Sequence, residues 1–457
     1  MRIAAALSIL LLLATGCRRA DSAPPPATGA ASPGTAPAAA RLATDPPAAA
    51  VLAMLPDGPE KRGFLLDCTG CHQMDMGRAF PAGRARTREE WRVIVARMLA
   101  FAGWQGPFPI MSAARDAERT ADFLARHLAA APAHGEAYVG VVDADVREYA
   151  YPHAMDLPHD LAVDADASVV VTGMFTHRMF VLDPASGVFE EVAIPVPQAN
   201  PRALEIDEAG DWWVLLGGPG MVARYRPSTD EWRTWPVGMY GHDVRPDGRG
   251  GAWFNGHFSK APEQIGRVDT ATGAVRTVDV PGPTPDADGG GPIPYGMRIA
   301  PDGMVWMTEL HGNRLVGHDP ATGAFRFHAL PTEASGPRRL DVDRAGVLWV
   351  PAYAAGSLVR FDPTTSEFRE YPLPYRDALP YVVRIDHERN RIWIGTGAAD
   401  ALFLFDPSTE TFGTVPLPTR GALVRHIDVD ERTGEVWAAY GASPGIPPKI
   451  ARIRLAS

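Results

Sequence analysis

The part of this sequence that is best equipped for chemistry is DCTGCHQ, residues 67–73, where two cysteines and a histidine lie within five positions. Such a cluster can supply half of a zinc site, a redox dithiol, or the attachment point of a haem held by two thioether bonds. A zinc site would need two further ligands, and the nearby sequence has neither a second C-x-x-C nor a closely spaced histidine pair. A thioredoxin-like site would need a βαβ context, whereas these flanks are polar and helical in pattern. The spacing therefore predicts one covalent haem c, attached to Cys68 and Cys71, with His72 as an axial iron ligand.

The N-terminus predicts that the chain is exported. MRIAAALSILLLLATGC, residues 1–17, has an early arginine, an apolar run too short to span a bilayer stably, and small residues before Cys17. This is the pattern of a signal peptide. ATGC resembles a bacterial lipobox, which implies that Cys17 carries a lipid; the alternative is a plain cleaved signal with an incidental cysteine. Residues 18–50 are rich in Pro and Ala and predict a flexible linker. We therefore expect a periplasmic lipoprotein that touches the membrane through its lipid anchor only.

Residues 51–133 are expected to form a small all-α cytochrome c domain. TREE, residues 87–90, is a capping box that predicts the start of a helix. On this helix Trp91, Val95 and Met98 share one face. A second helix is expected from about Ser112 to residue 130, with a buried side formed by Phe123, Leu124, His127 and Leu128. A helix after C-x-x-C-H and another at the end is the plan of small c-type cytochromes. The W-x-x-x-V-x-x-M pattern is similar to the haem domains of quinohaemoprotein amine dehydrogenases.

The sequence leaves the sixth iron ligand open between several residues. Met98 lies on the apolar helical face and fits the pattern of that family, while Met111 lies in the loop before the final helix, where many small cytochromes place their ligand. Met74, Met76, another histidine and an open position are further alternatives. A His/Met pair would raise the reduction potential and favour electron transfer, whereas an open position would favour ligand chemistry.

Residues 134–457 repeat with a period of about 43 residues, which indicates a repeat architecture. Segments such as VLDPASGVFEEVAIP and RFDPTTSEFREYPLP are each typical of a turn between two strands. A large apolar residue recurs at one register of the intervening hairpins, where it should fill the wedge between neighbouring sheets. The positions are Val170, Trp213, Trp253, Trp306, Trp349, Trp393 and Trp437. Seven units predict a seven-bladed β-propeller, in which residues 136–152 complete the last blade and close the ring.

The segment PYGMRIAPDGMVWMTELHGNRLVGHDP, residues 294–320, resembles the repeat of virginiamycin B lyase and its streptogramin lyase relatives. The resemblance extends over about 300 residues and is carried mostly by the propeller framework, so it implies the fold more than the activity. The family opens an ester-linked ring by elimination, using a catalytic histidine and a Mg²⁺ ion held by glutamates. It places these residues at two registers of the repeat, eleven residues before the blade tryptophan and three residues after it.

The residues of this chain at those registers differ from the set that the lyase reaction needs. The first register, which we call the channel ring, reads His159, Arg202, His242, Tyr295, Arg338, Tyr381 and, with a one-residue insertion in the last two blades, Arg425. The second register reads Gly173, Leu216, Gly256, Glu309, Ala352, Thr396 and Tyr440. An E-x-H motif ahead of Glu309 would need Glu and His where this chain has Ile293 and Tyr295. A Mg-dependent C–O lyase is therefore the alternative function.

Three arginines in the channel ring would repel one another unless an anionic group lies among them. We interpret the ring, with Glu309 below it, as a site for a small molecule that carries a carboxylate or phosphate. The alternative is that each arginine bonds to the backbone of a neighbouring blade or to Glu309. Four further histidines are interpreted as surface polar residues: His177, His257, His311 and His318.

The charge composition argues against two classes of binding partner. The net charge is −10 with both signs interspersed, which argues against a nucleic-acid surface or an anionic membrane surface. The sequence as a whole predicts a periplasmic c-type haem protein that exchanges electrons with a redox partner. If it is an enzyme, we expect an oxidoreductase that oxidises an anionic molecule at the channel ring. A propeller that only docks a partner protein is a further alternative.

Overall fold

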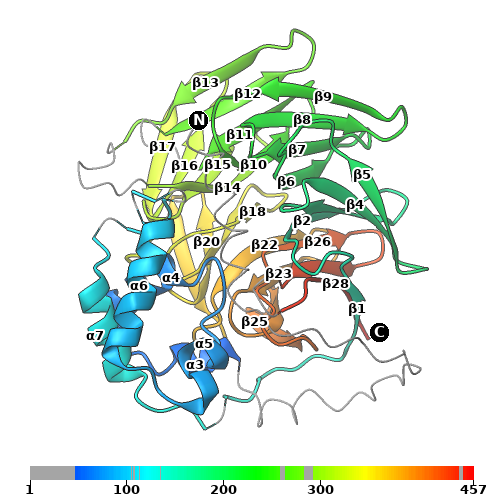
Figure 1. Ribbon diagram of the computed structural model, residues 1–457. Helices are drawn as coiled ribbons and strands as arrows, with labels where there is room; N and C mark the ends of the chain where they lie inside the picture. The colour runs from blue at the N-terminus through cyan, green and yellow to red at the C-terminus, as the bar shows by residue number, and fades with distance from the viewer. Residues whose placement is uncertain are drawn as a thin grey trace.

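The computed structural model of this chain describes residues 47–456, except for 104, 107–108, 113, 134, 258–262, 283–291 and 442–445. Cys17, the predicted signal peptide and the linker up to residue 46 lie outside the described residues. Within the described part, six short helical elements precede 28 strands (Figure 1). None of the helices in this part is long and apolar enough to cross a membrane.

The strands form a seven-bladed β-propeller of four-stranded antiparallel sheets, as predicted (Figure 1). The first three blades contain β2 (Pro158–Val163), β3 (Val169–Gly173), β4 (Arg178–Asp183) and β5 (Val188–Ala193); β6 (Pro201–Ile206), β7 (Trp212–Leu216), β8 (Met221–Arg226) and β9 (Glu231–Pro236); β10 (Gly241–Pro246), β11 (Gly251–Gly256), β12 (Gln264–Asp269) and β13 (Val275–Asp279). The next three contain β14 (Pro294–Ile299), β15 (Val305–Glu309), β16 (Arg314–His318) and β17 (Phe325–Ala329); β18 (Asp341–Val342), β19 (Leu348–Ala352), β20 (Ser357–Asp362) and β21 (Glu367–Pro372); β22 (Pro380–Asp386), β23 (Arg391–Thr396), β24 (Ala401–Asp406) and β25 (Thr411–Pro416). The first strands of neighbouring blades contact one another around the central channel.

The seventh blade is built from both ends of the propeller sequence. Its inner strands are β26 (His426–Asp430), β27 (Glu435–Tyr440) and β28 (Lys449–Leu455), and its outer strand is β1 (Ala144–Ala150). β1 pairs with β28 along its whole length. The strand expected within residues 136–152 is therefore confirmed. Because it covers the edge that β28 would otherwise expose, the ring is closed by backbone hydrogen bonds.

The recurring tryptophans fill the space between blades, as the repeat predicts. Each lies on the second strand of its blade, and all six are buried, as is Val170. Trp213, for example, belongs to one apolar cluster with Val244 and Phe254 of the next blade. This apolar wedge fixes how neighbouring first strands approach one another, and those strands carry the channel ring.

The helices precede the propeller, and local capping explains where they begin. They are α3 (Ala48–Leu52), α4 (Pro59–Cys68), α5 (Met76–Ala79), the 3-10 turn η1 (Pro81–Gly83), α6 (Arg88–Ala102) and α7 (Ala117–His127). The capping box before α6 is present, with hydrogen bonds in both directions between Thr87 and Glu90. α7 begins at Ala117 rather than near Ser112, because the carboxylate of Asp116 accepts the N–H of Arg119 and caps the helix there.

The helices are packed against the propeller and share its core. Phe64 of α4 and Trp91 of α6 belong to the same buried cluster as Tyr353 and Leu402 of the fifth and sixth blades. Figure 1 shows the helices together on one side of these blades. The structure therefore confirms helices before a propeller, and the identity of residues 51–133 as a cytochrome c domain stays a prediction.

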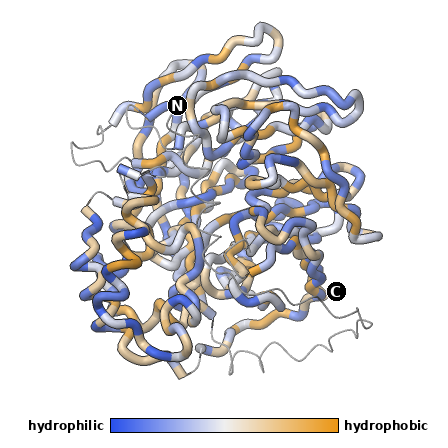
Figure 2. The backbone as a smooth tube through the Cα atoms, in the orientation of Figure 1, coloured by the Kyte–Doolittle hydropathy of each residue, from blue (hydrophilic) through white to orange (hydrophobic). Residues whose placement is uncertain are grey.

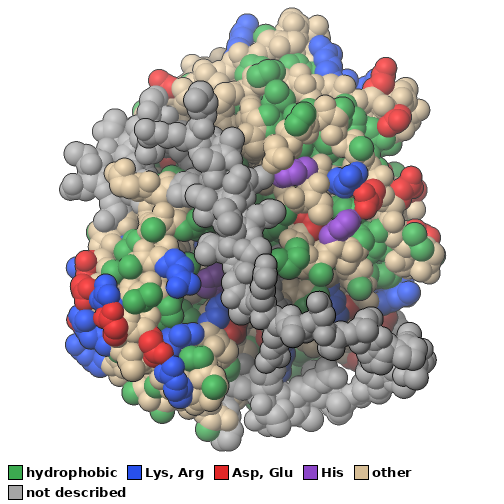
Figure 3. Space-filling model, in the orientation of Figure 1, with side chains coloured by type: hydrophobic (Ala, Val, Ile, Leu, Met, Phe, Trp, Pro, Cys, Tyr) green, Lys and Arg blue, Asp and Glu red, His purple; other side chains and the backbone are tan. Residues whose placement is uncertain are grey.

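The helical surface carries charges of both signs side by side (Figure 3). Arg88 of α6, for example, lies 2.8 Å from the carboxylate of Glu118 on α7 and also bonds to Asp122. Figure 2 shows hydrophobic and hydrophilic residues alternating along α6 and the strands, as expected for elements with one buried side.

A double-mutant cycle at Lys61 and Asp377 tests whether the helices are fastened to the propeller in solution. The two groups lie 2.7 Å apart, and their side chains are only 3% and 10% exposed. The cycle Lys61→Met and Asp377→Leu should therefore show a coupling energy of about 0.5–3 kcal/mol in denaturant unfolding. The exposed pair Arg344 and Glu388 is the matched control and should show a smaller coupling because water and salt screen it. A coupling of zero between Lys61 and Asp377 would contradict this packing.

Candidate functional site

One cavity in the helical part collects the sulfur and imidazole groups that the sequence singled out. Its lining includes Cys68 and His72 of the C-x-x-C-H motif and both candidate methionines, Met98 of α6 and Met111. The rest of the lining is Phe64, Met74, Arg78, Arg86, Trp91, Ile94, Val95 and Leu124. Cys71, the second attachment cysteine, is exposed and does not line this space. The structure thus brings three of the four predicted haem and metal ligands together around one largely apolar cavity.

The His72 side chain is arranged as a metal-binding imidazole should be. Its Nδ1 atom lies 3.1 Å from the carbonyl oxygen of Gln73. A proton on Nδ1 that is donated to this carbonyl leaves the Nε2 lone pair available for a metal. Burial lowers the pKa of His72, and the guanidinium groups of Arg78 and Arg425 lower it further. The imidazole is therefore neutral at pH 7, which is the form that binds iron.

The thiol of Cys68 lies in an environment that suppresses ionisation. Burial, together with the nearby carboxylate of Asp67, raises the pKa of this thiol to about 12. A thiol of this kind is a poor nucleophile and a poor thiolate ligand at neutral pH. The environment fits a cysteine that ends in a thioether better than one that works as a redox dithiol.

Polar groups in the same lining fit the carboxylates of a porphyrin. Arg86 and Arg78, the latter ion-paired with the carboxylate of Asp75, bring two guanidinium groups to the cavity. The Nε1–H of Trp91, a residue only 1% exposed, has no hydrogen-bond partner among the described residues. A buried unpaired donor costs about 1–3 kcal/mol, which an acceptor in the cavity would relieve. The cavity measures about 150 Å³, below the ~300–1,000 Å³ of usual ligand pockets, so a porphyrin requires the lining to open.

The loop that carries the motif, residues 68–73, rests on the propeller through backbone and side-chain hydrogen bonds. The Tyr353 hydroxyl lies 2.9 Å from Thr69 Oγ1 and 3.0 Å from the Thr69 carbonyl oxygen. Arg425 Nη2 donates to the carbonyl oxygen of Cys71 at 2.6 Å. We refer to residues 68–73 as the C-x-x-C-H loop.

Two further contacts bind the C-x-x-C-H loop to the propeller. The amide of Gln73 donates to the Asp400 carboxylate at 3.2 Å. Gly70 lies so close to the propeller that a Cβ atom on it would be 2.7 Å from Nη2 of Arg338. The loop that carries the two cysteines is therefore in direct contact with two residues of the channel ring.

The structure places all seven channel-ring residues at or just before the first strand of their blades, and all are at most 7% exposed. The ring centroids of His242 and Tyr295 are 3.8 Å apart, and those of His159 and His242 are 6.1 Å apart. The hydroxyls of Tyr295 and Tyr381 are 2.5 Å apart. Arg202 donates to the hydroxyl of Tyr240 at 2.6 Å. The predicted convergence of these residues is therefore seen, at a channel mouth that the C-x-x-C-H loop contacts.

The channel-ring histidines hold neighbouring blades together. His159 Nδ1 lies 2.9 Å from the carbonyl oxygen of Arg202, and His242 Nδ1 lies 2.9 Å from that of Tyr295, each in the next blade. Burial lowers the pKa of His159 to about 3 and that of His242 well below its usual value. Both imidazoles are therefore neutral at pH 7, and the positive charge of the ring comes from its arginines.

Arg338 is enclosed by aromatic rings. It is fully buried, and its guanidinium carbon lies 3.9, 4.5 and 4.9 Å from the ring centroids of Tyr353, Tyr381 and Tyr295. Nη1 donates to the Tyr295 hydroxyl at 2.6 Å, while Nε and Nη2 have no hydrogen-bond partner among the described residues. Cation–π contacts of this kind contribute up to about 2 kcal/mol each when desolvated.

Glu309 is held away from the channel ring by its own blade. Its carboxylate is bound by Arg314, with Nη2 to Oε1 at 2.9 Å. Burial and the carboxylate of Glu309 raise the pKa of the neighbouring Glu263 to about 9, so Glu263 is largely protonated at pH 7. Glu309 thus forms a pair of neighbouring carboxyl groups with Glu263, and Arg314 binds the Glu309 member of this pair. Among the described residues, Glu309 makes no ion pair with an arginine of the channel ring.

Several residues at the channel mouth were missed by the sequence analysis. His257 is 1% exposed and its ring lies 4.6 Å from that of His242, so the interpretation of His257 as a surface residue is wrong, as it is for the buried His318. Tyr353, which contacts the C-x-x-C-H loop, shares with His257 a third register, four residues after the blade tryptophan. A comparison of all repeats at that register would have pointed to both residues.

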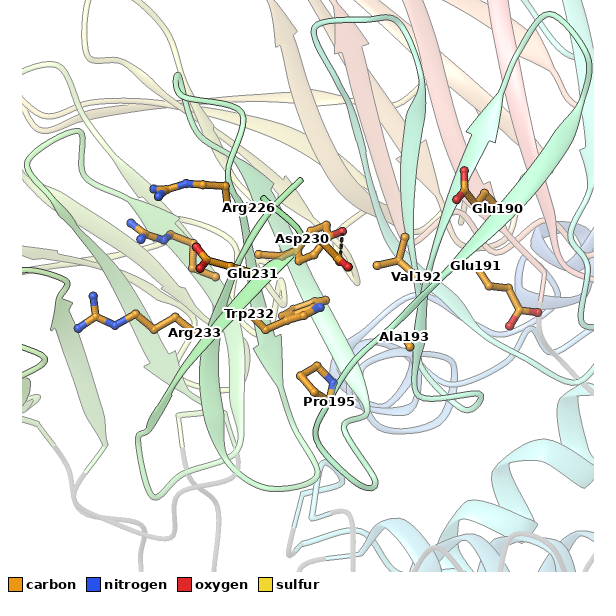
Figure 4. A pocket seen from close by; sticks show the side chains of 12 residues that line it. Glu190, Glu191, Val192, Ala193, Pro195, Arg226, Asp230, Glu231, Trp232 and Arg233 are labelled. Carbon is orange, nitrogen blue, oxygen red and sulfur yellow. Dashed lines mark hydrogen bonds between the residues drawn. The ribbon is translucent and has the colours of Figure 1, made fainter. Parts of the chain in front are cut away.

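A groove at the rim of the propeller is separate from this site. It lies between β5 of the first blade and the β8–β9 hairpin of the second (Figure 4), and it encloses about 1090 Å³. Its charged residues include Arg226, which is bound by Asp211 at 2.8 Å. The groove arises where two blades diverge, and none of the residues predicted to carry chemistry lines it.

Comparison with known proteins supports the propeller class. The sequence profile of the virginiamycin B lyase family matches residues 247–446, less than half of the chain. A streptogramin B lyase structure is similar, with 22% identity and a TM-score of 0.61, over 69% of this chain and 98% of that one. The structure of a catalytically inactive virginiamycin B lyase from Staphylococcus aureus with quinupristin is 19% identical, with a TM-score of 0.59, over 69% of this chain and 100% of that one. Kuenenia stuttgartiensis hydrazine synthase is 15% identical, with a TM-score of 0.51, over 65% of this chain and 97% of that one. No curated protein matches the sequence.

The fold and these comparisons define a seven-bladed β-propeller protein. More particularly, the repeats in residues 247–446 are similar to those of the virginiamycin B lyase family. At the family's E-x-H positions the chain carries Ile293 and Tyr295. Among the described residues, no three His, Cys, Asp or Glu side chains are grouped so that they could hold a metal ion.

Proposed function

We propose that this protein is a periplasmic c-type haem protein that transfers electrons, with its haem carried by helices on the mouth of a propeller. The observation that carries the proposal is the cavity in which Cys68, His72, Met98 and Met111 meet. C-x-x-C-H is the spacing at which haem is attached through two thioethers. The signal-peptide pattern of residues 1–17 supports export to the compartment where this attachment takes place.

The residues of the C-x-x-C-H motif and of the cavity have defined roles under this proposal. Cys68 and Cys71 hold the porphyrin covalently, and His72 presents its Nε2 atom to the iron. Arg86 and the Trp91 N–H would bind the porphyrin carboxylates, and Arg78 would do so beside its partner Asp75. The apolar remainder of the lining excludes water, which is one of the levers that sets a haem potential. When bound, the haem would supply a reversible Fe(III)/Fe(II) couple.

The proposal includes an anionic small molecule as the electron donor, bound at the channel ring. The support is that two guanidinium nitrogens of Arg338, Nε and Nη2, have no hydrogen-bond partner among the described residues. Arg202 adds a second guanidinium group to the same ring. A molecule bound there would lie next to the C-x-x-C-H loop, because Arg338 contacts Gly70 of that loop. A periplasmic redox partner would then take the electrons from the haem.

Single substitutions distinguish the haem ligands in exported, haem-loaded protein. His72→Ala should abolish the normal low-spin spectrum. Of Met98→Ala and Met111→Ala, the variant that lacks the true ligand should lose the methionine-to-iron charge-transfer band and shift to a lower reduction potential, because a His/Met pair raises the potential. Met155→Ala is the control, since Met155 is 73% exposed and far from the cavity lining in the chain. Identical spectra for wild type and all of these variants would contradict the assignment of the cavity.

Thermal unfolding tests the anion site. Added phosphate or lactate should raise the melting temperature of the wild-type protein, because a ligand that binds only the folded state stabilises it by mass action. The rise should be smaller in Arg202→Gln, which removes one ring cation, and unchanged in Arg233→Gln, which removes an exposed arginine of the same blade. If neither anion raises the melting temperature of the wild type, the anion site is refuted.

A streptogramin-type lyase is the second candidate, and the family match over residues 247–446 is the observation that favours it. We expect a cyclic depsipeptide to remain intact when it is incubated with this protein and Mg²⁺, because Tyr295 and Ile293 occupy the family's catalytic positions. Chromatography and mass spectrometry would detect the linear product. Its formation at a rate above that of buffer would make the lyase the leading function.

A further inference from the structure

The C-x-x-C-H loop is bound by the propeller at most of its positions, and two of the contacting groups are channel-ring cations. Arg425 donates to the carbonyl oxygen of Cys71 at 2.6 Å. Nη2 of Arg338 lies against Gly70, where a Cβ atom would be only 2.7 Å away. Both guanidinium groups therefore contact the backbone at or between the two attachment cysteines.

Neither of these cations is neutralised by a carboxylate. Within the described part of the chain, no Asp or Glu oxygen lies within 4.0 Å of the guanidinium nitrogens of Arg338 or Arg425, whereas the buried Arg339 next to Arg338 is paired with Asp160 at 2.8 Å. Arg338 has phenol rings around it instead, and Arg425 makes its other hydrogen bond to the carbonyl oxygen of Gly441 at 3.3 Å. The carboxylate of Asp400, which binds Gln73 of the loop, has Arg420 as its own partner at 3.6 Å. The channel mouth thus presents two positive charges without a carboxylate partner to the loop.

Burial makes these two charges effective at a distance. Arg338 is fully buried and Arg425 is 5% exposed. Charges in such surroundings interact through a lower effective dielectric than surface charges do, and dissolved salt screens them much less. Burial lowers the pKa of the imidazoles of His159 and His242 and raises that of the Tyr295 hydroxyl, so these channel-ring groups are neutral at pH 7 and do not cancel the charge. Arg338 and Arg425 in turn lower the pKa of the buried Tyr381 hydroxyl, which shows that their charges act across the ring.

We propose that Arg338 and Arg425 of the propeller are positioning residues that raise the reduction potential of a haem attached to the C-x-x-C-H loop. Ferrous haem carries one positive charge less than ferric haem, so nearby cations favour the ferrous form. The propeller would thereby make the haem a better acceptor of electrons. This inference rests on the proposed haem function and deepens it, because it gives the propeller a role in electron transfer that needs no propeller chemistry.

Charge and hydrogen bonding can be separated at Arg425. Arg425→Gln keeps an amide N–H donor near the Cys71 carbonyl but removes the charge, whereas Arg425→Lys keeps the charge. In spectroelectrochemical titrations of exported, haem-loaded protein, we expect Arg425→Gln and Arg338→Gln to shift the midpoint potential to lower values. Arg425→Lys should remain close to wild type. Arg344→Gln, which removes an exposed arginine of the same propeller, should leave the potential unchanged.

Two further measurements exclude a purely structural explanation. Tyr353→Phe removes the hydroxyl that bonds to Thr69 without changing any charge. It should speed amide hydrogen exchange in residues 69–73 and leave the potential near that of wild type. The shift in Arg425→Gln should also persist at 1 M salt, where the Debye length is about 3 Å.

The outcomes separate this inference from the function on which it rests. A wild-type protein without a c-type α-band overturns the proposed function itself. An intact α-band with the wild-type potential in Arg425→Gln overturns the inference alone. An equally lowered potential in Tyr353→Phe would also overturn it, because loop packing rather than charge would then control the haem. If Arg338→Gln does not fold, the Gln and Lys variants of Arg425 decide the question.

Discussion

The packing of residues 68–73 against the mouth of the propeller channel is the constraint on which the rest of this structure depends. The loop reaches the buried guanidinium of Arg338 only because Gly70 has no side chain, and Tyr353 and Arg425 hold the backbone on either side of it. A shared apolar core and the buried Lys61–Asp377 pair fasten the surrounding helices to the same blades. The helices and the propeller therefore form a single packed unit in which the C-x-x-C-H loop cannot move independently of the channel.

The neutral and the charged side chains at the channel mouth have different roles. His159 and His242 are held neutral by burial and bind the backbone of the next blade, so they stabilise the ring of blades. Arg338 and Arg425 remain charged and have no carboxylate partner within the described residues, so they give the mouth its positive potential. Their cost in desolvation is offset by the tyrosine rings around Arg338 and by the backbone carbonyls that Arg425 binds.

The sequence was sufficient for the elements that repeat or that obey local rules. The register of Trp213 to Trp437 predicted seven blades, and the TREE segment predicted the start of α6, because periodicity and helix capping act over a few residues. The contacts between the C-x-x-C-H loop and the propeller could not be predicted in this way. The bonds from Thr69 to Tyr353 and from Cys71 to Arg425 join residues 284 and 354 positions apart and leave no periodic signal. Glu309 was expected to lie below the ring arginines, but Arg314 of the same blade binds it, and only the packing decides between such partners.

The most direct test of the central claim is the mass of one peptide from exported protein. Trypsin should release residues 63–78, which contain both Cys68 and Cys71. The account predicts that this peptide carries the mass of one haem and that neither cysteine reacts with an alkylating reagent. A peptide of unmodified mass, with both thiols alkylated, would contradict the account.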